Sequence, residues 1–292
     1  MPVARDDLRA FLQAEPGCML VEIATVDGST PREAGAWMLV SQRGSFSTIG
    51  GGQLEFMAID HARRALRQGL GRGGQAAEPL SIPLGPEIGQ CCGGRVGLVF
   101  ETLTPALAAR LIERCEREIA ARPCVHLFGA GHVGNALALA LSLAPVRTIL
   151  LDGRAEELAA ARVPGVETRL TAMPEAVVRE APAGSAFVVL THDHALDFLI
   201  AAEALRRDDA AYVGMIGSKT KRATFRSWLT REVGHPELAG RLVCPIGGSG
   251  LDDKRPAVIA ALATAEILTA VLAPQARARA APGRRPAVRS MD

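Results

Sequence analysis

This sequence of 292 residues has few aromatic side chains and almost no excess of charge of either sign. Phe, Trp and Tyr make up only 4% of it, too little for the stacking surfaces on which single-stranded nucleic acid binds. Lys and Arg number 33 against 31 Asp and Glu, so the formal net charge of +2 gives no basic footprint. We therefore expect no nucleic-acid partner.

Long apolar runs and paired cysteines are scarce as well. No run approaches the ~18–20 apolar residues that span a bilayer, and the first residues, Met1–Asp7, lack the apolar core of a signal peptide. Six cysteines are too few for a disulfide framework, and none has the CxxC spacing of a structural zinc site. These absences predict a cytoplasmic protein with reduced thiols and no membrane association.

The composition that remains is that of a globular protein. Apolar residues make up 48% and charged residues 22%, which excludes disorder over most of the chain. At roughly 150 residues per domain, the length indicates about two domains. We expect a mixed α/β domain over residues 1–121, a second domain over 122–273, and a basic, disordered tail over 274–292.

Strand-like and helix-like segments differ between the two halves. In the second half, short apolar runs alternate with helical patterns, which predicts a parallel sheet with crossover helices. The expected strands there are residues 124–128, 148–152, 186–190 and 212–216. The expected helices are one that follows Gly129–Gly134 and ends at Leu143, and those at 196–207 and 256–272. In the first half we expect strands at 18–26, 37–41 and 95–103, and helices at 6–13, after Gly50–Gly52, and at 105–121.

A glycine fingerprint follows the first strand of the second half. Gly129 allows a tight turn, Gly131 lets the backbone approach a phosphate, and Gly134 lets the helix pack on the strand. Asp152 ends the next strand, where a Rossmann acid accepts ribose hydroxyls. The spacing predicts a Rossmann-like domain. Two interpretations stay open, nucleotide binding or a Rossmann fold that has lost it, because His132 is bulky and faces the ligand space.

A histidine-rich segment, Thr191–His194, follows the strand at 186–190. The carboxyl end of a parallel strand is where α/β proteins bind ligands, so His192, Asp193 and His194 are candidates for metal binding or proton transfer. The alternative is a helix start with Asp193 as its N-cap.

Further glycine loops occupy residues 214–221 and 244–250, and several such loops together suit a large, phosphate-bearing ligand. Cys91 and Cys92 are adjacent within a glycine-rich turn that includes Gly93 and Gly94. Thiolates are soft metal ligands and sulfur nucleophiles, which makes this pair a candidate site; the alternative is a buried turn.

Five motifs together resemble the XdhC/CoxI family, in order and over about residues 18–272. They are Gly50–Glu55, Gln90–Gly94, Phe128–Gly134, Thr191–His194 and Gly214–Ser218. The stretch from Cys244 to Ala261 is similar to the XdhC branch and departs from the CoxI-like branch. The resemblance implies a chaperone in purine metabolism that binds and protects molybdenum cofactor (molybdopterin), assists its sulfuration by a cysteine desulfurase, and inserts it into xanthine dehydrogenase.

The resemblance also implies partners and site residues. The partners are xanthine dehydrogenase, a cysteine desulfurase and molybdenum-cofactor biosynthesis proteins, and we expect a homodimer. Cys91 or Cys92 would contact molybdenum, and no catalytic residue is expected. The implied cofactor-binding residues are Gly51, Gly52, Gln53, Cys91, Cys92, Gly93, Gly94, Gly129, Gly131, His132, Gly134, Asp152, His192, Asp193 and His194.

Two other functions remain open at this stage. The chain could be an NAD(P)-dependent oxidoreductase that uses Asp152 for ribose and the His192–His194 region for proton transfer. It could also be a scaffold that holds the dehydrogenase and the desulfurase together without touching the cofactor.

Overall fold

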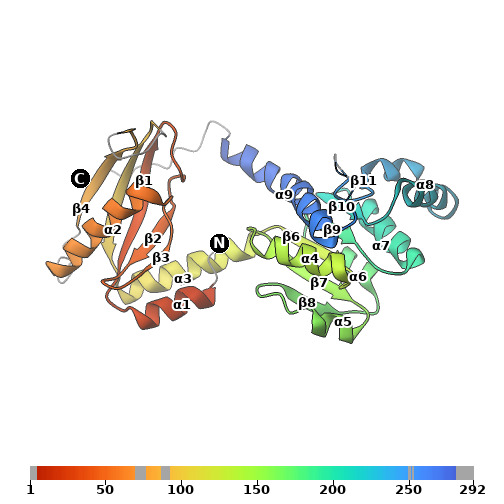
Figure 1. Ribbon diagram of the computed structural model, residues 1–292, viewed down its shortest axis with the longest axis horizontal. Helices are drawn as coiled ribbons and strands as arrows, with labels where there is room; N and C mark the ends of the chain where they lie inside the picture. Colours follow the sequence, from red (N-terminus) through yellow and green to blue (C-terminus); the bar gives the residue numbers. More distant parts are fainter. Residues whose placement is uncertain (1–4, 70–76, 87–92, 249–250, 252, 281–292) are drawn as a thin grey trace. The chain divides into compact units, whose positions relative to one another are not determined.

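A computed structural model describes residues 5–69, 77–86, 93–248, 251 and 253–280 (Figure 1). They divide into two compact units, with the division in the chain between Ala120 and Ala121. Cys91 and Cys92 lie outside the described residues, so the predictions made for them have no structural counterpart.

The N-terminal unit is built on an antiparallel sheet of five strands in the order β3-β2-β1-β5-β4. Its strands are β1 Met19–Asp27, β2 Trp37–Val40, β3 Ser45–Ser47, β4 Ala77–Pro83 and β5 Arg95–Thr102. Its helices are α1 Arg5–Ala14, α2 Gly52–Arg67 and α3 Pro105–Ala120.

Helices cover both faces of this sheet. Alternate residues of β1 point to opposite faces, so Val21 joins one core cluster and Leu20 the other. On the Val21 side, α2 packs Leu54, Ala58, Ala62 and Ala65, which share one side of the helix. On the Leu20 side, α1 and α3 contribute Leu8, Leu107, Leu111 and Cys115.

The C-terminal unit contains a parallel sheet of six strands. The order is β8-β7-β6-β9-β10-β11; numbered from β6, this is 3-2-1-4-5-6, the order of a Rossmann fold. The predicted fold class is therefore confirmed. The strands are β6 Cys124–Phe128, β7 Arg147–Asp152, β8 Glu167–Leu170, β9 Ala186–Val189, β10 Tyr212–Met215 and β11 Leu242–Val243.

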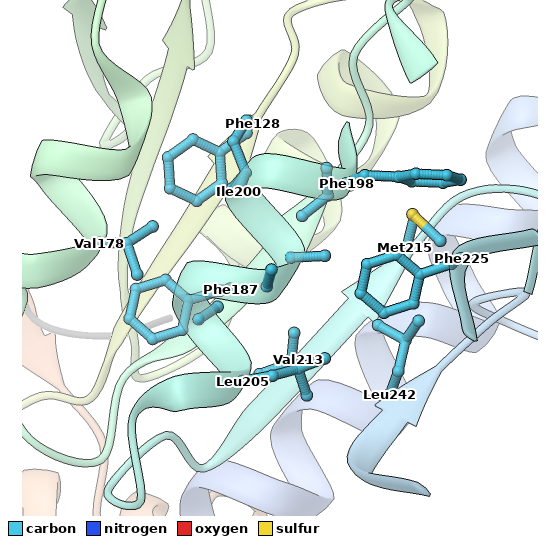
Figure 2. Close-up of a cluster of buried hydrophobic side chains, with 14 of the residues drawn as sticks. Phe128, Val178, Phe187, Phe198, Ile200, Leu205, Val213, Met215, Phe225 and Leu242 are labelled. Atoms are coloured by element: carbon cyan, nitrogen blue, oxygen red, sulfur yellow. The ribbon is translucent and has the colours of Figure 1, made fainter. Parts of the chain in front are cut away.

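Two layers of helices bury this sheet. Figure 2 shows the core on one face, to which Phe128 and Phe187 of the strands, Phe198 of α7 and Phe225 of α8 all contribute. On the other face α4 and α9 pack against the strands. The helices are α4 His132–Ser142, α5 Ala155–Ala160, α6 Pro174–Glu180, α7 His194–Arg206, α8 Lys219–Trp228 and α9 Pro256–Ala280. A π-helical turn, Leu229–Val233, and a 3₁₀ segment, Pro236–Arg241, follow α8.

The last helix departs from the sequence predictions in two ways. It continues to Ala280, so residues 274–280, predicted as the start of a disordered tail, are helical; Ala and Arg, which dominate there, are strong helix formers. The prediction that no segment has the length and apolarity of a membrane span is also wrong. The window Pro256–Ala273 has a mean hydropathy of 1.9 and passes that test by length and composition, because isolated Thr and Glu residues hardly lower the average.

Only 22% of the residues in that window are buried. Those that are, Ala260, Ala263, Ile267 and Val271, pack in the core between α4 and the sheet.

Candidate functional site

A crevice of about 250 Å³ opens at the carboxyl edge of the parallel sheet. We name it the fingerprint crevice. The ends of β6, β7, β8 and β9 contribute to it, through Gly129, Asp152, Thr171 and Thr191 with its neighbour His192. The fold thus brings Gly129, Asp152 and His192 together, although they are more than twenty residues apart in sequence.

The three fingerprint glycines have different surroundings. Gly129 has a φ of +122°, and a Cβ there would lie 2.5 Å from the carbonyl oxygen of Leu190. A Cβ on Gly134 would overlap the carbonyl oxygen of Gly129. Gly131 has no heavy atom within 4 Å of where its Cβ would stand. Gly129 and Gly134 are therefore required by the packing, whereas Gly131 borders open space.

The open space lies at the first turn of α4. Gly131 is the N-cap of this helix and caps it with no side chain. The amide groups at such a helix start carry partial positive charge and attract anions. His132, the first residue of α4, is exposed beside them, and the side chain of Asn135 donates to the carbonyl oxygen of Ala130 over 2.8 Å. The Asn135 side chain thus holds the loop on its protein side, and the Gly131 side of the loop faces open space.

Asp152 fixes the fingerprint loop from the neighbouring strand. Its Oδ2 accepts a hydrogen bond from the amide of Ala130 at 2.8 Å and one from Arg154 Nη2 at 3.1 Å. Its Oδ1 accepts from the amide and from Nε of Arg154, both at 3.0 Å. Burial alone would raise the pKa of Asp152, but these hydrogen bonds outweigh it and hold the pKa below its usual range. The carboxylate is ionised, and both oxygens are already engaged within the protein.

The Thr191–His194 motif is divided by the start of α7. Asp193 is the N-cap, and its side chain accepts from the amides of Ala195 and Leu196 at 2.8 and 3.3 Å, as the helix-start interpretation predicts. His192 lines the fingerprint crevice, while His194 is exposed on the first turn of α7. Within the described ranges no group of three or more His, Cys, Asp or Glu side chains could hold a metal ion.

Sequence reasoning missed a buried ion pair behind this motif. The side chain of Asp197, on α7, is completely buried and accepts from Lys221 Nζ of α8 at 2.5 Å. Asp197 also accepts from the amide and the hydroxyl of Thr191, at 3.1 and 2.7 Å. The pair thus joins the loop after β9 to the loop after β10. The one signal in the sequence is an acid within the otherwise apolar residues 195–202.

A second crevice, of about 550 Å³, lies at the ends of β10 and β11. We name it the β10–β11 crevice. Both glycine loops predicted from the sequence line it, through residues 216–219 and 245–248. Ser218 caps α8 by accepting from the amide of Lys221 at 3.2 Å. A Cβ on Gly217 would lie 2.7 Å from Cδ of Lys221, so the glycine leaves room for the lysine stem.

In the glycine motif of the N-terminal unit, Gly50–Glu55, backbone amides bind a carboxylate of the motif itself. Oε1 of Glu55 accepts from the amides of Ile49, Gly50 and Gly51 at 2.9, 3.2 and 2.9 Å. Gly52 and Gln53 follow as the exposed first residues of α2. The internal carboxylate therefore occupies the anion-binding position that these amides form.

A turn at residues 27–31 contacts this motif and also Gly94, which directly precedes β5. A Cβ on Gly94 would overlap the carbonyl oxygen of Ser29, and a Cβ on Gly50 would lie 2.7 Å from Cγ of Pro31. Gly93 adopts a φ of +69° beside it. Gly50 and Gly94 thus pack against the same turn of the N-terminal unit.

Comparison with known proteins gives matches over both units. A profile described as the XdhC and CoxI family matches residues 11–73, and one described as the XdhC Rossmann domain matches residues 125–267. An uncharacterized Escherichia coli protein, YqeB, is 28% identical over 87% of this chain, which spans 44% of that protein's length.

A solved structure shares the fold. A crystal structure described as a xanthine dehydrogenase from Bacillus halodurans aligns with a TM-score of 0.75 over 95% of this chain and 98% of that one, at 17% identity. The two profile matches show that the chain belongs to the XdhC and CoxI family.

Proposed function

We propose that this protein is an accessory factor of xanthine dehydrogenase that binds molybdenum cofactor and inserts it into the enzyme. The observation that carries the proposal is the family membership, which rests on separate profile matches in each unit. The cofactor is then cargo that the protein receives, protects and releases, and the protein itself catalyses no turnover.

The C-terminal unit fits the anionic part of such cargo. Molybdopterin carries a phosphate, and the start of α4 at Gly131 offers amides beside open space. Asp193, in contrast, is engaged as a cap, so we assign His192 rather than Asp193 to the ligand side of the motif.

The sulfur chemistry is proposed for the cysteine pair. Cys91 or Cys92 would hold the molybdenum end of the cargo, since thiolates bind soft metals. A cysteine desulfurase would supply the sulfur for sulfuration, and molybdenum-cofactor biosynthesis proteins would supply the cargo. We further propose a cytoplasmic homodimer.

Transfer to the dehydrogenase tests the proposal. Protein loaded with molybdenum cofactor should restore activity to cofactor-free xanthine dehydrogenase in proportion to the cofactor supplied. The Cys91→Ser/Cys92→Ser double variant should lose cargo on gel filtration, and full retention by that variant would refute the role of the cysteine pair. Failure of loaded wild-type protein to activate the enzyme would refute insertion.

A thermal-shift experiment distinguishes the oxidoreductase alternative. A ligand that binds only the folded state stabilises it by RT ln(1 + [L]/Kd), about 2.7 kcal/mol at a hundredfold excess over Kd. Molybdopterin should raise the midpoint and NAD or NADP should not. Saturable stabilisation by NAD, without transfer to the dehydrogenase, would favour the oxidoreductase.

A further inference from the structure

A groove of about 900 Å³ lies between α8 and the 3₁₀ segment in the C-terminal unit. We name it the α8 groove. One wall is formed by Lys219, Arg222 and Arg226 of α8, and the other by Pro236, Ala239 and Gly240 of the 3₁₀ segment. It lies apart from the fingerprint crevice, with which it shares no residue.

Three cations form a row on this side of α8. Lys219, Arg222 and Arg226 are separated by three and four residues, so they share one face of the helix over about 10 Å. Phe225, about a quarter turn around the helix from this row, is fully buried in the core. All three cations are exposed.

These cations have no acidic partner within the described part of the chain, unlike many arginines of the same unit. Arg147, Arg207 and Arg255, for example, each pair with a nearby carboxylate. The one acid that lines the groove, Glu237, is bonded to Nδ1 of His235 at 2.9 Å. The groove therefore keeps an uncompensated positive charge.

The positions of Lys219 and Arg222 at the start of α8 oppose helix stability. The start of a helix carries partial positive charge, which favours acidic side chains in the first turn. Helices α5, α6 and α7 have acidic side chains there, whereas α8, like α4 and α9, has none. Asp197 neutralises Lys221, but Lys219 and Arg222 are left facing the groove. An anion in the groove would relieve this repulsion, and such local conflicts are typical of functional surfaces.

The shape of the row indicates which anion fits. The cations are spread along a line rather than converging on one point, which suits an extended chain better than a single phosphate. Alternate side chains of an extended peptide recur about every 7 Å on one side, a spacing that two carboxylates can match to this row. The lining residues include no aromatic side chain on which a nucleic-acid base could stack.

We propose that the α8 groove is a docking site for an extended acidic segment of a partner protein. Lys219 lines both this groove and the β10–β11 crevice, so the docked segment ends beside the glycine loops of the sheet edge. Docking there stands independently of which cargo the protein carries.

The test uses a fluorescein-labelled octapeptide of alternating Glu and Ser, titrated with the full chain and followed by fluorescence anisotropy. The variant Arg222→Glu/Arg226→Glu reverses two groove charges. The matched control, Arg162→Glu/Arg169→Glu, changes the net charge equally at two exposed arginines of the same unit that lie outside the groove. Circular dichroism melts establish that each variant is folded.

The wild-type protein should bind the peptide, and more weakly as salt is raised. The groove variant should lose about tenfold in affinity, and the control less than about twofold. The variant Arg222→Gln/Arg226→Gln removes the two charges without reversing them, so its loss of peptide affinity should be intermediate. It replaces the charge-reversal variant in the test if charge reversal lowers the melting midpoint. The proposal would be overturned if the wild-type protein did not bind the peptide, or if the groove and control variants lost the same affinity. It would also be overturned if an eight-nucleotide oligothymidylate bound more tightly than the peptide and lost that binding in the groove variant.

Discussion

The fingerprint glycines allow a prediction in which three similar replacements have different consequences. Gly129→Ala, Gly131→Ala and Gly134→Ala each add one methyl group to the same loop. The methyl group would lie 2.5 Å from the carbonyl oxygen of Leu190 in the first variant, and it would overlap the carbonyl oxygen of Gly129 in the third. In the second it would meet no heavy atom within 4 Å.

The expected losses of stability follow from these surroundings. At Gly129, a φ of +122° costs alanine about 1–3 kcal/mol of strain, and the close contact adds about 1–3 kcal/mol. Gly134 lies inside α4, where alanine regains up to about 1 kcal/mol of helix propensity, so its net loss should be smaller, about 2 kcal/mol. Gly131 has a φ of −71°, which alanine adopts without strain, and its loss should stay below about 1 kcal/mol.

Urea titration followed by circular dichroism measures the three losses, and a binding assay with molybdopterin measures the consequence for cargo. Gly129→Ala should be the least stable variant and Gly131→Ala close to wild type, while Gly131→Val, with a larger side chain, should bind cargo more weakly although it is folded. If Gly131→Ala were as destabilised as Gly134→Ala, the assignment of open space at the start of α4 would be wrong. Unchanged cargo affinity in folded Gly131→Val would instead indicate a Rossmann domain that no longer binds the ligand there.

Other predictions concern buried polar groups and the N-terminal turn. Burial lowers the pKa of His126 from 6.5 to about 4, so the unfolded chain takes up a proton that the folded chain rejects. The free energy of unfolding is therefore unaffected by protonation of His126 above pH 6.5 and falls by about 3 kcal/mol as the pH drops to about 4. Urea titrations across this pH range should show a weaker pH dependence of that free energy in His126→Phe. Asp197→Asn should cost about 3–5 kcal/mol in urea titration because it leaves Lys221 without its buried partner, and Asp197→Leu/Lys221→Met should recover part of that loss. Gly94→Ala should lower the melting temperature of the N-terminal unit, since its methyl group overlaps the carbonyl of Ser29, whereas Gly93→Asn, at a φ of +69° with open space, should be tolerated.

Within the C-terminal unit, the strands that sequence reasoning found are those buried at most or all of their positions. Strands β6, β9 and β10 are buried at every position, so each reads as a continuous apolar run. Strand β8 escaped notice because all four of its residues, Glu167–Leu170, are exposed at the edge of the sheet. Strand β11 is two residues long, too short for any period to show. Edge strands of this kind are defined by their neighbour's hydrogen bonds and leave little pattern in their own residues.

Some residues of the candidate site could be related to each other from the sequence, and others could not. Spacing alone related Gly129 to Asp152, because a strand, a turn and a helix of ordinary length separate them. No local rule relates Asp197 to Lys221, which meet only because α7 and α8 pack side by side on the sheet. Glu55 was also beyond reach, since a glycine-rich helix start looks equally suited to an outside anion and to a carboxylate from the helix itself.

The hydrogen bonds that Asp152 already accepts affect which ligand the fingerprint crevice favours. A dinucleotide is anchored at two points, with its pyrophosphate at the helix start and its ribose hydroxyls at the acid. Here the acid already accepts four hydrogen bonds from Ala130 and Arg154, so ribose could bind only by displacing the Arg154 side chain, which is itself partly exposed. The anchor at Gly131 needs no such displacement. Arg154→Ala should therefore remove one side-chain hydrogen bond from each oxygen of Asp152 and create NAD affinity if ribose exclusion is the reason for weak dinucleotide binding, as isothermal titration of the variant and the wild type can measure. Equal and tight NAD binding by both proteins would show that the pairing of Asp152 excludes nothing.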